Sequence, residues 1–433
     1  MRTALLASIF FCSLVGAQPA VTVIKAARLF DAKSDRMIQP GIIVVAGKQI
    51  QAVGGQAPSG ATVIDLGDAT LLPGFIDAHT HLTMAFNPDY SGARLLQLNR
   101  TIPEQAIRAT ENARKILMAG FTTVRDVGSS NFLDVGLRNS INAGVVPGPH
   151  MLVAVHALGS TGGHCDDSAG FRFGLFNRET GPEDGVINSA DQARFAVRFN
   201  IKYGADVIKT CATGGVLSPT DDVDVPQLSQ AELDALVSEA HALRRKTAAH
   251  AHGAEGAKRA IRAGIDSIEH GTFLDDEALR MMREKGTYLV PTLAVRSGLA
   301  ESKFPPLVQQ KADMAVKGQD AMVRRALAMG VKIALGTDAA VYPHGNNALE
   351  FVLMVNDGMT PAQSLKAGTS VAADLLGLSS RIGSLETGKE ADIVAVPGNP
   401  LDDIKVTQSA LFVMKDGLVY RNDRASQLAA SSH

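Results

Sequence analysis

The sequence predicts an α/β protein, a (β/α)8 TIM barrel with a small β-sandwich domain built from both chain ends. Three observations lead to this expectation. Short β-rich segments occur at both ends of the 433-residue chain. The middle alternates short apolar strands with amphipathic helices, and its polar residues recur where those strands end. We therefore place the β-sandwich domain at 18–72 plus 384–433 and the barrel at 73–383.

The first 17 residues read as a secretory signal peptide. Met1-Arg2 precedes an apolar stretch at 4–15 that is too short to span a bilayer, and small residues end at Ala17. We predict cleavage near Ala17 and an exported protein, periplasmic or secreted. No later segment is apolar enough to predict a membrane span.

Bulk composition excludes some partners. Hydrophobic residues make up 45% of the chain, charged residues 20%, and the formal net charge is -2. This balance indicates a globular protein and no nucleic-acid partner. Cleavage of the signal peptide leaves Cys165 and Cys211, and two cysteines are no disulfide framework. The sequence leaves their pairing open.

Both chain ends alternate apolar strands with turn residues. A hairpin signal, Asp416-Gly417, lies between two of the C-terminal strands. The predicted strands of this part are 21–24, 41–45, 50–53, 62–65, 391–396, 411–414 and 418–420.

The middle of the chain predicts eight strand–helix units. One helix is expected at 104–119, with Ile107, Ala113, Ile116 and Leu117 on one face. Another is expected at 230–243, with Ser229 as N-cap and Glu232 completing a capping box. The rival, a doubly wound sheet, lacks a Gly-rich dinucleotide fingerprint after the first strand. The predicted strands are 75–79, 122–126, 151–155, 206–209, 247–250, 267–270, 288–291 and 333–337.

Polar residues follow or end five of these eight strands. In a (β/α)8 barrel the carboxyl ends of the strands carry the functional side chains. A buried strand rarely ends in His or Lys unless that group is bonded or ligated. The residues at these ends are His79, His81, Lys209, His250, His252, His270 and Asp338.

These residue types suit a metal centre. His79 and His81 are two residues apart on a strand, so both rings face the same side and can bind one ion. Asp338 could ligate and shuttle a proton, although a helix N-cap or Asx-turn is the structural alternative. A buried Lys209 tends to lose its proton and could take up carbon dioxide as a bridging carbamate; binding of a substrate carboxylate is its alternative. Spacing does not decide which of His250 and His252 binds metal.

Several segments together resemble the amidohydrolase superfamily, in particular its imidazolonepropionase-like, prolidase-annotated branch. That branch includes Xaa-Pro-type dipeptidases and ochratoxinase-like amidohydrolases. The match follows the family order over nearly the whole mature chain. The segments are PGFIDAHTH (73–81), GADVIKT (204–210), AAHAHG (248–253), DSIEHG (266–271), LGTDA (335–339) and GSLETGKEADIV (383–394).

The resemblance implies a role for each residue. It implies two Zn²⁺ ions per chain, bridged by the carbamate that Lys209 forms with carbon dioxide. The implied metal ligands are His79, His81, Lys209, His250, His270 and Asp338, with Asp338 also catalytic. The implied substrate contacts are His252, which also assists catalysis, His164 in a loop after the third strand, and His344.

The resemblance also implies a substrate class. The branch releases the C-terminal amino acid from N-acyl amino acids or dipeptides, and ochratoxin A fits that class because it joins an isocoumarin acid to phenylalanine. The alternatives are a cyclic amide or lactone hydrolase, or a non-catalytic metal-binding scaffold. Arg125 and Tyr203 are weaker candidates for a substrate carboxylate site, with a structural role favoured for each. A homo-oligomer, as large as an octamer, is expected from the branch alone.

Overall fold

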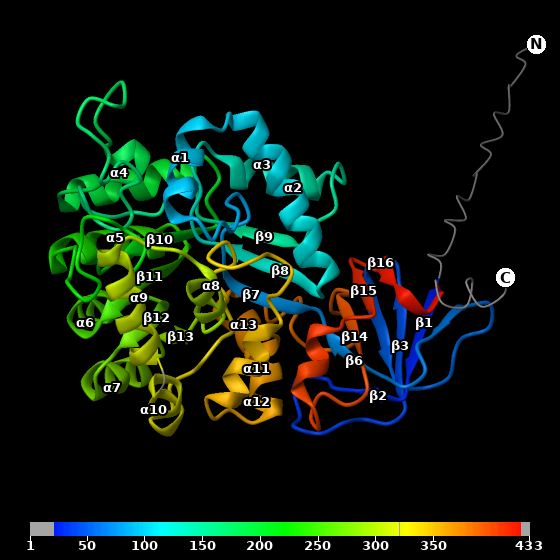
Figure 1. The fold of residues 1–433 in the computed structure, drawn as a ribbon. Helices are drawn as coiled ribbons and strands as arrows, with labels where there is room; N and C mark the ends of the chain where they lie inside the picture. Colours follow the sequence, from blue (N-terminus) through cyan, green and yellow to red (C-terminus); the bar gives the residue numbers. More distant parts are fainter. Residues whose placement is uncertain (1–20, 320, 426–433) are drawn as a thin grey trace, which may run out of the picture.

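The computed structural model describes residues 21–319 and 321–425 (Figure 1). The predicted signal peptide lies outside these residues. In Figure 1 the strands from the two chain ends, blue and red, lie together on one side of the molecule, beside the helix-rich part. No helix in the described part of the chain combines the length and apolar character that a membrane span requires.

Strands from both chain ends form two sheets. The first has the order β4-β3-β1-β5 and the second the order β16-β15-β14-β6-β2. The second sheet joins the two ends directly, because β14 pairs antiparallel with β6. Apolar side chains of both sheets, including Ile24, Ile43, Ile393 and Phe412, form one buried cluster. The strands are β1 (Val21–Ala26), β2 (Arg28–Leu29), β3 (Gly41–Ala46), β4 (Gln49–Val53), β5 (Thr62–Asp65), β6 (Ala69–Pro73), β14 (Ile393–Pro397), β15 (Phe412–Lys415) and β16 (Leu418–Asn422).

The predicted hairpin turn is present. Asp416 and Gly417 join β15 to β16 with φ angles of 52° and 72°. Two successive positive φ angles match the right-handed twist of the flanking strands, and Asp-Gly is a pair that adopts them readily.

The middle of the chain holds two parallel sheets. One contains β7 (Phe75–Thr80), β8 (Phe121–Asp126) and β9 (His150–Val153). The other contains β10 (Val207–Cys211), β11 (Lys246–Gly253), β12 (Ser267–Phe273) and β13 (Tyr288–Val290). An isolated parallel bridge between Leu158 and Thr210 links the segment after β9 to β10.

The segment predicted as the eighth strand does not form a regular one. Ile333 makes an isolated parallel bridge to Leu289, and Ala339 makes one to Thr80. Between them the Leu335 N–H donates to Ala367 O, outside these strands. The extended run then ends because Asp338 has a φ of 58° and Ala340 a φ of 130°.

Helices lie between and around the parallel strands (Figure 1). They are α1 (Tyr90–Asn99), α2 (Ile102–Met118), α3 (Leu133–Asn142), α4 (Ala190–Lys202), α5 (Gln230–Ala242), α6 (Ala254–Ala263), α7 (Asp276–Lys285), α8 (Val295–Glu301), α9 (Pro306–Gln319), α10 (Met322–Ala328), α11 (Leu349–Asn356), α12 (Pro361–Ala367) and α13 (Ser370–Leu375), with 3-10 turns η1 (Pro182–Asp184) and η2 (Ile404–Gln408).

Two helices that the sequence predicted in detail, α2 and α5, can be compared with the structure. The capping box at the start of α5 is confirmed, since Ser229 accepts the Glu232 N–H and Glu232 accepts the Ser229 N–H. On α2, Ile116 and Leu117 are buried as predicted, but Ile107 is 71% exposed. The buried face of α2 instead begins with Ala109, four residues before Ala113 and seven before Ile116, so Ile107 was wrongly assigned to it.

Candidate metal centre

The carboxyl ends of the parallel strands bring the predicted ligands together. Two groups of three side chains have ligand atoms within 4.8 Å of one another. One group is His79, His81 and Asp338, and the other is His250, His252 and His270. The His79 and His270 rings, one from each group, are 5.0 Å apart between centroids, so the two groups are neighbours.

Hydrogen bonds assign the free nitrogen of each ring in the first group. His81 Nδ1 lies 3.0 Å from Gly128 O, and a carbonyl oxygen only accepts, so Nδ1 carries the proton. His79 Nδ1 donates to the Glu269 carboxylate at 2.7 Å. The Nε2 lone pairs of both rings therefore remain free. They lie 3.6 Å (His79) and 3.4 Å (His81) from Asp338 Oδ1, beyond hydrogen-bond length.

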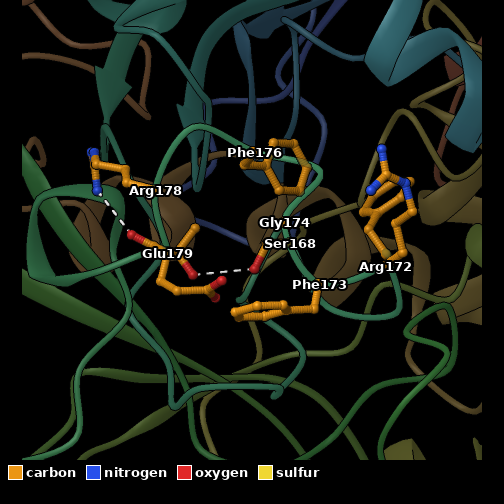
Figure 2. Close-up of a pocket in the computed structure, with 9 residues that line it drawn as sticks. Ser168, Arg172, Phe173, Gly174, Phe176, Arg178 and Glu179 are labelled. Carbon is orange, nitrogen blue, oxygen red and sulfur yellow. Dashed lines mark hydrogen bonds between the residues drawn. The ribbon is translucent and has the colours of Figure 1, made fainter.

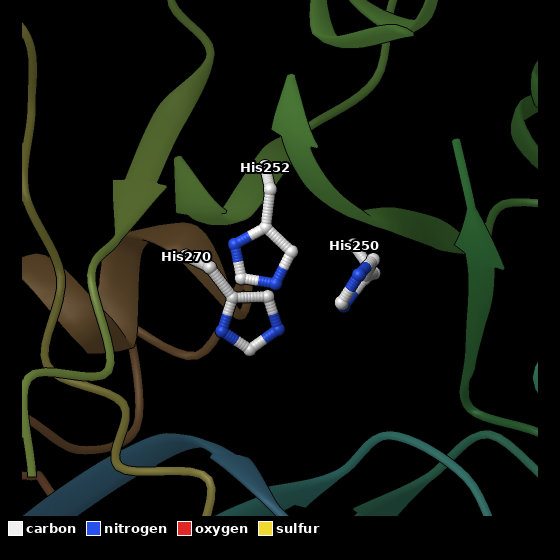
Figure 3. Close-up of side chains that lie close together, drawn as sticks. All are labelled: His250, His252 and His270. Carbon is white, nitrogen blue, oxygen red and sulfur yellow. The ribbon is translucent and has the colours of Figure 1, made fainter. Parts of the chain in front are cut away.

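Figure 3 shows the rings of the second group, His250, His252 and His270. Hydrogen bonds orient these rings as well. His250 Nε2 donates to Gly214 O at 3.0 Å, which leaves the lone pair on Nδ1. His270 Nδ1 lies 2.7 Å from Thr292 Oγ1, whose own proton goes to Pro291 O. The threonine oxygen must then accept, and His270 keeps its lone pair on Nε2.

The third ring of this group, His252, stacks on His270 at 5.0 Å with an interplanar angle of 13°. Its Nδ1 is 2.7 Å from Thr272 Oγ1.

Burial keeps these rings neutral. Desolvation lowers the pKa of His79, His81, His250 and His270 below that of a free imidazole. It lowers the pKa of His252 to about 3. Neutral rings with one nitrogen held by an acceptor and the other free are the form that binds a metal ion. The donor set thus fits a pair of metal ions.

Lys209 lies near both groups. It is 3% exposed, and desolvation lowers the pKa of its ammonium to about 8 although the Glu269 and Asp338 carboxylates raise it. Its charge in turn lowers the pKa of histidines in each group, including His79 and His270. No ion pair within 4 Å links its Nζ to another described residue. An amine with a pKa of about 8 is about one-tenth neutral at pH 7, a far larger neutral fraction than that of an exposed lysine.

Two of the predicted ligands have a left-handed backbone conformation. His270 has a φ of 69° and Asp338 a φ of 58°. Residues with side chains adopt this region at a cost of about 1–3 kcal/mol, and such residues concentrate at functional sites. The Thr337 and Asp338 N–H groups both donate to His79 O, at 3.2 and 2.7 Å, which holds the strained segment against β7.

A buried glutamate beneath the centre was missed by the sequence patterns. Glu269 accepts hydrogen bonds from His79, Arg125 and Ser267. It fixes the orientation of the His79 ring and balances the Arg125 charge. The only sequence signal was its position next to His270, where the alternation of a strand turns its side chain away from that of the ligand.

The predicted substrate residue His164 lies against the second group. Its ring stacks on that of His250 with centroids 4.1 Å apart. Its Nδ1 is 3.0 Å from Ser218 Oγ, and burial lowers its pKa to about 4. A Cβ on Gly215 would lie 2.2 Å from the His164 ring, so only glycine permits this approach.

A disulfide joins the residue after His164 to the end of β10. Cys165 and Cys211 are bonded, with Cα atoms 5.9 Å apart. Cys211 follows Lys209 by two residues on the same strand. The bond therefore ties the loop that carries His164 to the strand that carries Lys209, and it answers the question that the sequence left open.

The other three candidates for substrate contact, His344, Arg125 and Tyr203, contact other parts of the protein. The His344 Nε2–H donates to His81 O at 3.2 Å, so His344 supports the backbone of a predicted ligand. Arg125 is fully buried and pairs with Glu269. Tyr203 is 41% exposed and packs on Phe132, with ring centroids 4.9 Å apart. Arg125 and Tyr203 thus make the structural contacts that the sequence favoured for them.

The loop after the disulfide carries several aromatic side chains (Figure 2). The Arg94 guanidinium lies 4.3 Å above the centre of the Phe171 ring, and Phe176 packs edge-on against Phe171. Phe173 is 90% exposed. The hollow in this loop has a volume of about 40 Å³, too small for an organic substrate.

Comparisons with known proteins agree with this geometry. Residues 70–419 match the model of the Amidohydrolase family. The chain is 32% identical to ochratoxinase from Aspergillus niger over 93% of its length and 87% of that protein. A solved Xaa-Pro dipeptidase with methionine bound in its active site shares 41% identity, with a TM-score of 0.87 over 93% of this chain and 100% of the other. A prolidase complexed with N-methylphosphonate-L-proline shares 28% identity, with a TM-score of 0.83 over the same shares.

Proposed function

Because the chain belongs to the amidohydrolase family, whose members hydrolyse amide bonds, we propose that it releases the C-terminal amino acid from N-acyl amino acids or dipeptides at a binuclear zinc centre. The proposal rests mainly on the ring nitrogens that remain free to bind metal. Those of His79 and His81 lie near Asp338, and those of His250 and His270 belong to the neighbouring group. We include ochratoxin A among the proposed substrates because this chain is similar to ochratoxinase over nearly its whole length.

The ligands divide between two ions. We assign His79 and His81 to one Zn²⁺, His250 and His270 to the other, and Asp338 to complete the set. Lys209, whose pKa is about 8, would form a carbamate with carbon dioxide and so become an anion with two oxygens that can join both ions. When bound, the ions supply Lewis acidity that activates water and polarises the amide carbonyl.

The side chains carry out the proton transfers. The Asp338 carboxylate accepts the proton of the attacking water and passes it to the nitrogen of the leaving amine, which departs as a neutral amino group. His252 Nδ1 can accept a hydrogen bond from the Thr272 hydroxyl; the ring proton is then on Nε2, where it can donate to the substrate carbonyl oxygen. Asp338 and His252 are thus the proposed catalytic residues.

Substrate contacts are assigned to the rim of the centre. His164 Nδ1 donates to Ser218 Oγ, whose own proton goes to the Asp221 carboxylate, so Nε2 keeps a lone pair that can accept a hydrogen bond from a substrate N–H. His344 is a weaker candidate because its Nε2–H is already used by His81 O.

The larger organisation is proposed on the same basis. We propose that the seven parallel strands and the segment 333–339 close into a (β/α)8 barrel at 73–383, supported by the parallel bridges at both ends of that segment. The sheets at 18–72 and 384–433 would form the β-sandwich domain, supported by their shared core. Residues 1–17 are proposed as a signal for export, and assembly as a homo-oligomer is proposed from the family resemblance.

Amino acid release from a substrate panel tests the function. The zinc-loaded protein should hydrolyse N-acetyl-phenylalanine, Xaa-Pro dipeptides or ochratoxin A faster than hydantoin or lactones, and chelation should abolish the activity. Asp338→Asn should reduce kcat by about 100-fold or more. Asp374→Asn should not, because Asp374 is an exposed residue of α13 that contacts Lys332 and Tyr288, the latter at the amino end of β13. Faster turnover of a cyclic amide or lactone would contradict the substrate class, and metal binding without any turnover would indicate a scaffold.

A further inference from the structure

A third group of possible ligands lies away from the proposed catalytic centre. His150 is the first residue of β9, so it lies at the amino end of the parallel strands, whereas the catalytic groups lie at their carboxyl ends. Asp392 directly precedes β14, and Asp416 lies in the turn between β15 and β16. The three side chains therefore come from a parallel strand and from the sheet that joins the chain ends. One ligand atom from each lies within 4.8 Å of the other two.

The distances within this group exceed hydrogen-bond length. His150 Nε2 is 3.5 Å from Asp392 Oδ2 and 3.7 Å from Asp416 Oδ1. An N–H···O hydrogen bond spans about 2.7–3.2 Å. Ligands about 2.0–2.2 Å from a tetrahedral ion are separated from one another by about 3.3–3.6 Å. The spacing is closer to that of ligands around an ion than to that of a histidine–carboxylate ion pair.

Two of these atoms are buried without a partner. Seven buried side-chain nitrogen and oxygen atoms of the described residues have no hydrogen bond, and His150 Nε2 and Asp392 Oδ2 are two of them. Asp392 is only 4% exposed. Leaving a buried carboxylate oxygen unsatisfied is unfavourable by about 1–3 kcal/mol. The two unsatisfied atoms face one another, and a cation between them would satisfy both.

The carboxylates are held in place by other contacts. Asp392 Oδ1 accepts the Asp416 N–H at 2.9 Å, which leaves Oδ2 for another partner. Lys415 is buried and donates to Gly148 O at 2.7 Å, so the hairpin is fixed against the segment just before His150. Lys48 Nζ is 3.4 Å from Asp416 Oδ2, on the other side of that carboxylate. These contacts orient the ligand atoms without using them.

A cavity beside the group gives an ion access from solvent. This cavity of about 630 Å³ lies beside His150 and is lined by Thr123, Leu152, Arg381 and Glu390 among others. The side chains of His150 and Asp416 are 20% and 22% exposed, which leaves room for a water molecule as a further ligand.

We propose that His150, Asp392 and Asp416 bind one divalent transition-metal cation, represented by Zn²⁺, at a second site independent of catalysis. One imidazole nitrogen and two carboxylate oxygens form a mixed donor set that suits such ions. The ion would link the start of β9 to β14 and to the β15–β16 hairpin. It would thereby stabilise the contact between the parallel strands and the sheet that joins the chain ends.

Metal content of matched variants tests this site. The full-length protein is saturated with Zn²⁺, passed through a desalting column and measured by mass spectrometry of the metal. We expect His150→Gln and Asp416→Asn each to retain one zinc fewer per chain than the wild type. The control is His241→Gln, because His241 Nε2 makes an ordinary 2.8 Å contact with the Asp266 carboxylate. It should retain the wild-type zinc content, and all three variants should keep amidase activity.

Anomalous scattering from zinc-soaked wild-type crystals provides a measurement that does not depend on any variant folding. We expect a peak at the zinc absorption edge between His150 Nε2 and the carboxylates of Asp392 and Asp416. Absence of that peak, or equal zinc content in the wild type and a folded His150→Gln variant, would overturn the proposal.

Discussion

Replacing Glu269 by glutamine should impair both the stability of the protein and its metal binding. The side chain is fully buried and accepts from His79 Nδ1 at 2.7 Å and from Arg125 Nη2 at 2.9 Å, with Ser267 as a third donor. Glutamine has nearly the same shape, but one acceptor oxygen becomes an NH2 group that can only donate. Three donors then compete for one oxygen.

The two consequences have different magnitudes. Arg125 is buried and keeps its charge, so loss of its anionic partner should destabilise the fold by about 3–5 kcal/mol, the range observed for broken buried ion pairs. His79 loses the carboxylate that orients its ring and keeps the proton on Nδ1. Removal of such a supporting hydrogen bond typically weakens metal affinity or activity by about 10–100-fold.

Urea unfolding and chelator competition separate these effects. Unfolding of the metal-free protein measures the loss of stability, and competition with a chromogenic chelator measures zinc affinity. Glu350→Gln is the control, because Glu350 is equally buried but accepts only from the Leu293 and Ala294 N–H groups. If Glu269→Gln loses stability but binds zinc within twofold of the wild type, Glu269 is only a partner of Arg125, and its proposed role toward His79 is refuted.

Three further predictions concern the fold. Burial raises the pKa of Glu350 to about 8, so the folded state holds this proton more tightly than the unfolded state. The unfolding free energy should therefore fall as the pH rises from about 5 to about 8, by at most about 1.4 kcal/mol per pH unit, and this contribution should level off above pH 8, with a shallower slope in Glu350→Gln during urea titrations. Phe351→Ala should lower the unfolding free energy by about 3–5 kcal/mol, because Phe351 is fully buried with its ring 4.9 Å from that of Phe75; a loss below 1 kcal/mol would contradict that packing. Replacing Cys165 and Cys211 by serine together should destabilise the protein by about 4 kcal/mol, since the bond closes a loop of 46 residues; equal stability of the wild type with and without a reductant would argue against it.

The candidate ligands could be predicted because strands impose a simple pattern. Alternation along β7 and the residue that follows it pairs His79 with His81, and alternation along β11 pairs His250 with His252. Parallel strands then bring their carboxyl ends to one edge, where Lys209 also lies. No comparable rule relates His150 to Asp392, because 242 residues separate them and only the packing of the two chain ends brings them together.

Features that depend on individual hydrogen bonds could not be predicted either. The ring nitrogen that each histidine leaves free depends on carbonyl and hydroxyl groups such as Gly128 O, Gly214 O and Thr292 Oγ1, which come from other strands and loops. Likewise, the role of Glu269 depends on its hydrogen bonds with His79 and Arg125, which lie on two other strands.

The segment around Asp338 shows how an irregular strand can position the proposed catalytic carboxylate. In an extended strand, successive side chains alternate between faces, so residues 337 and 338 would point to opposite sides. The left-handed φ of 58° at Asp338 breaks that alternation, and both the Thr337 and Asp338 N–H groups bond to His79 O. Asp338 Oδ1 is thereby brought to 3.6 and 3.4 Å from the Nε2 atoms of His79 and His81. A regular strand would have satisfied the sequence prediction, but it would not have placed Asp338 in this way between the two rings.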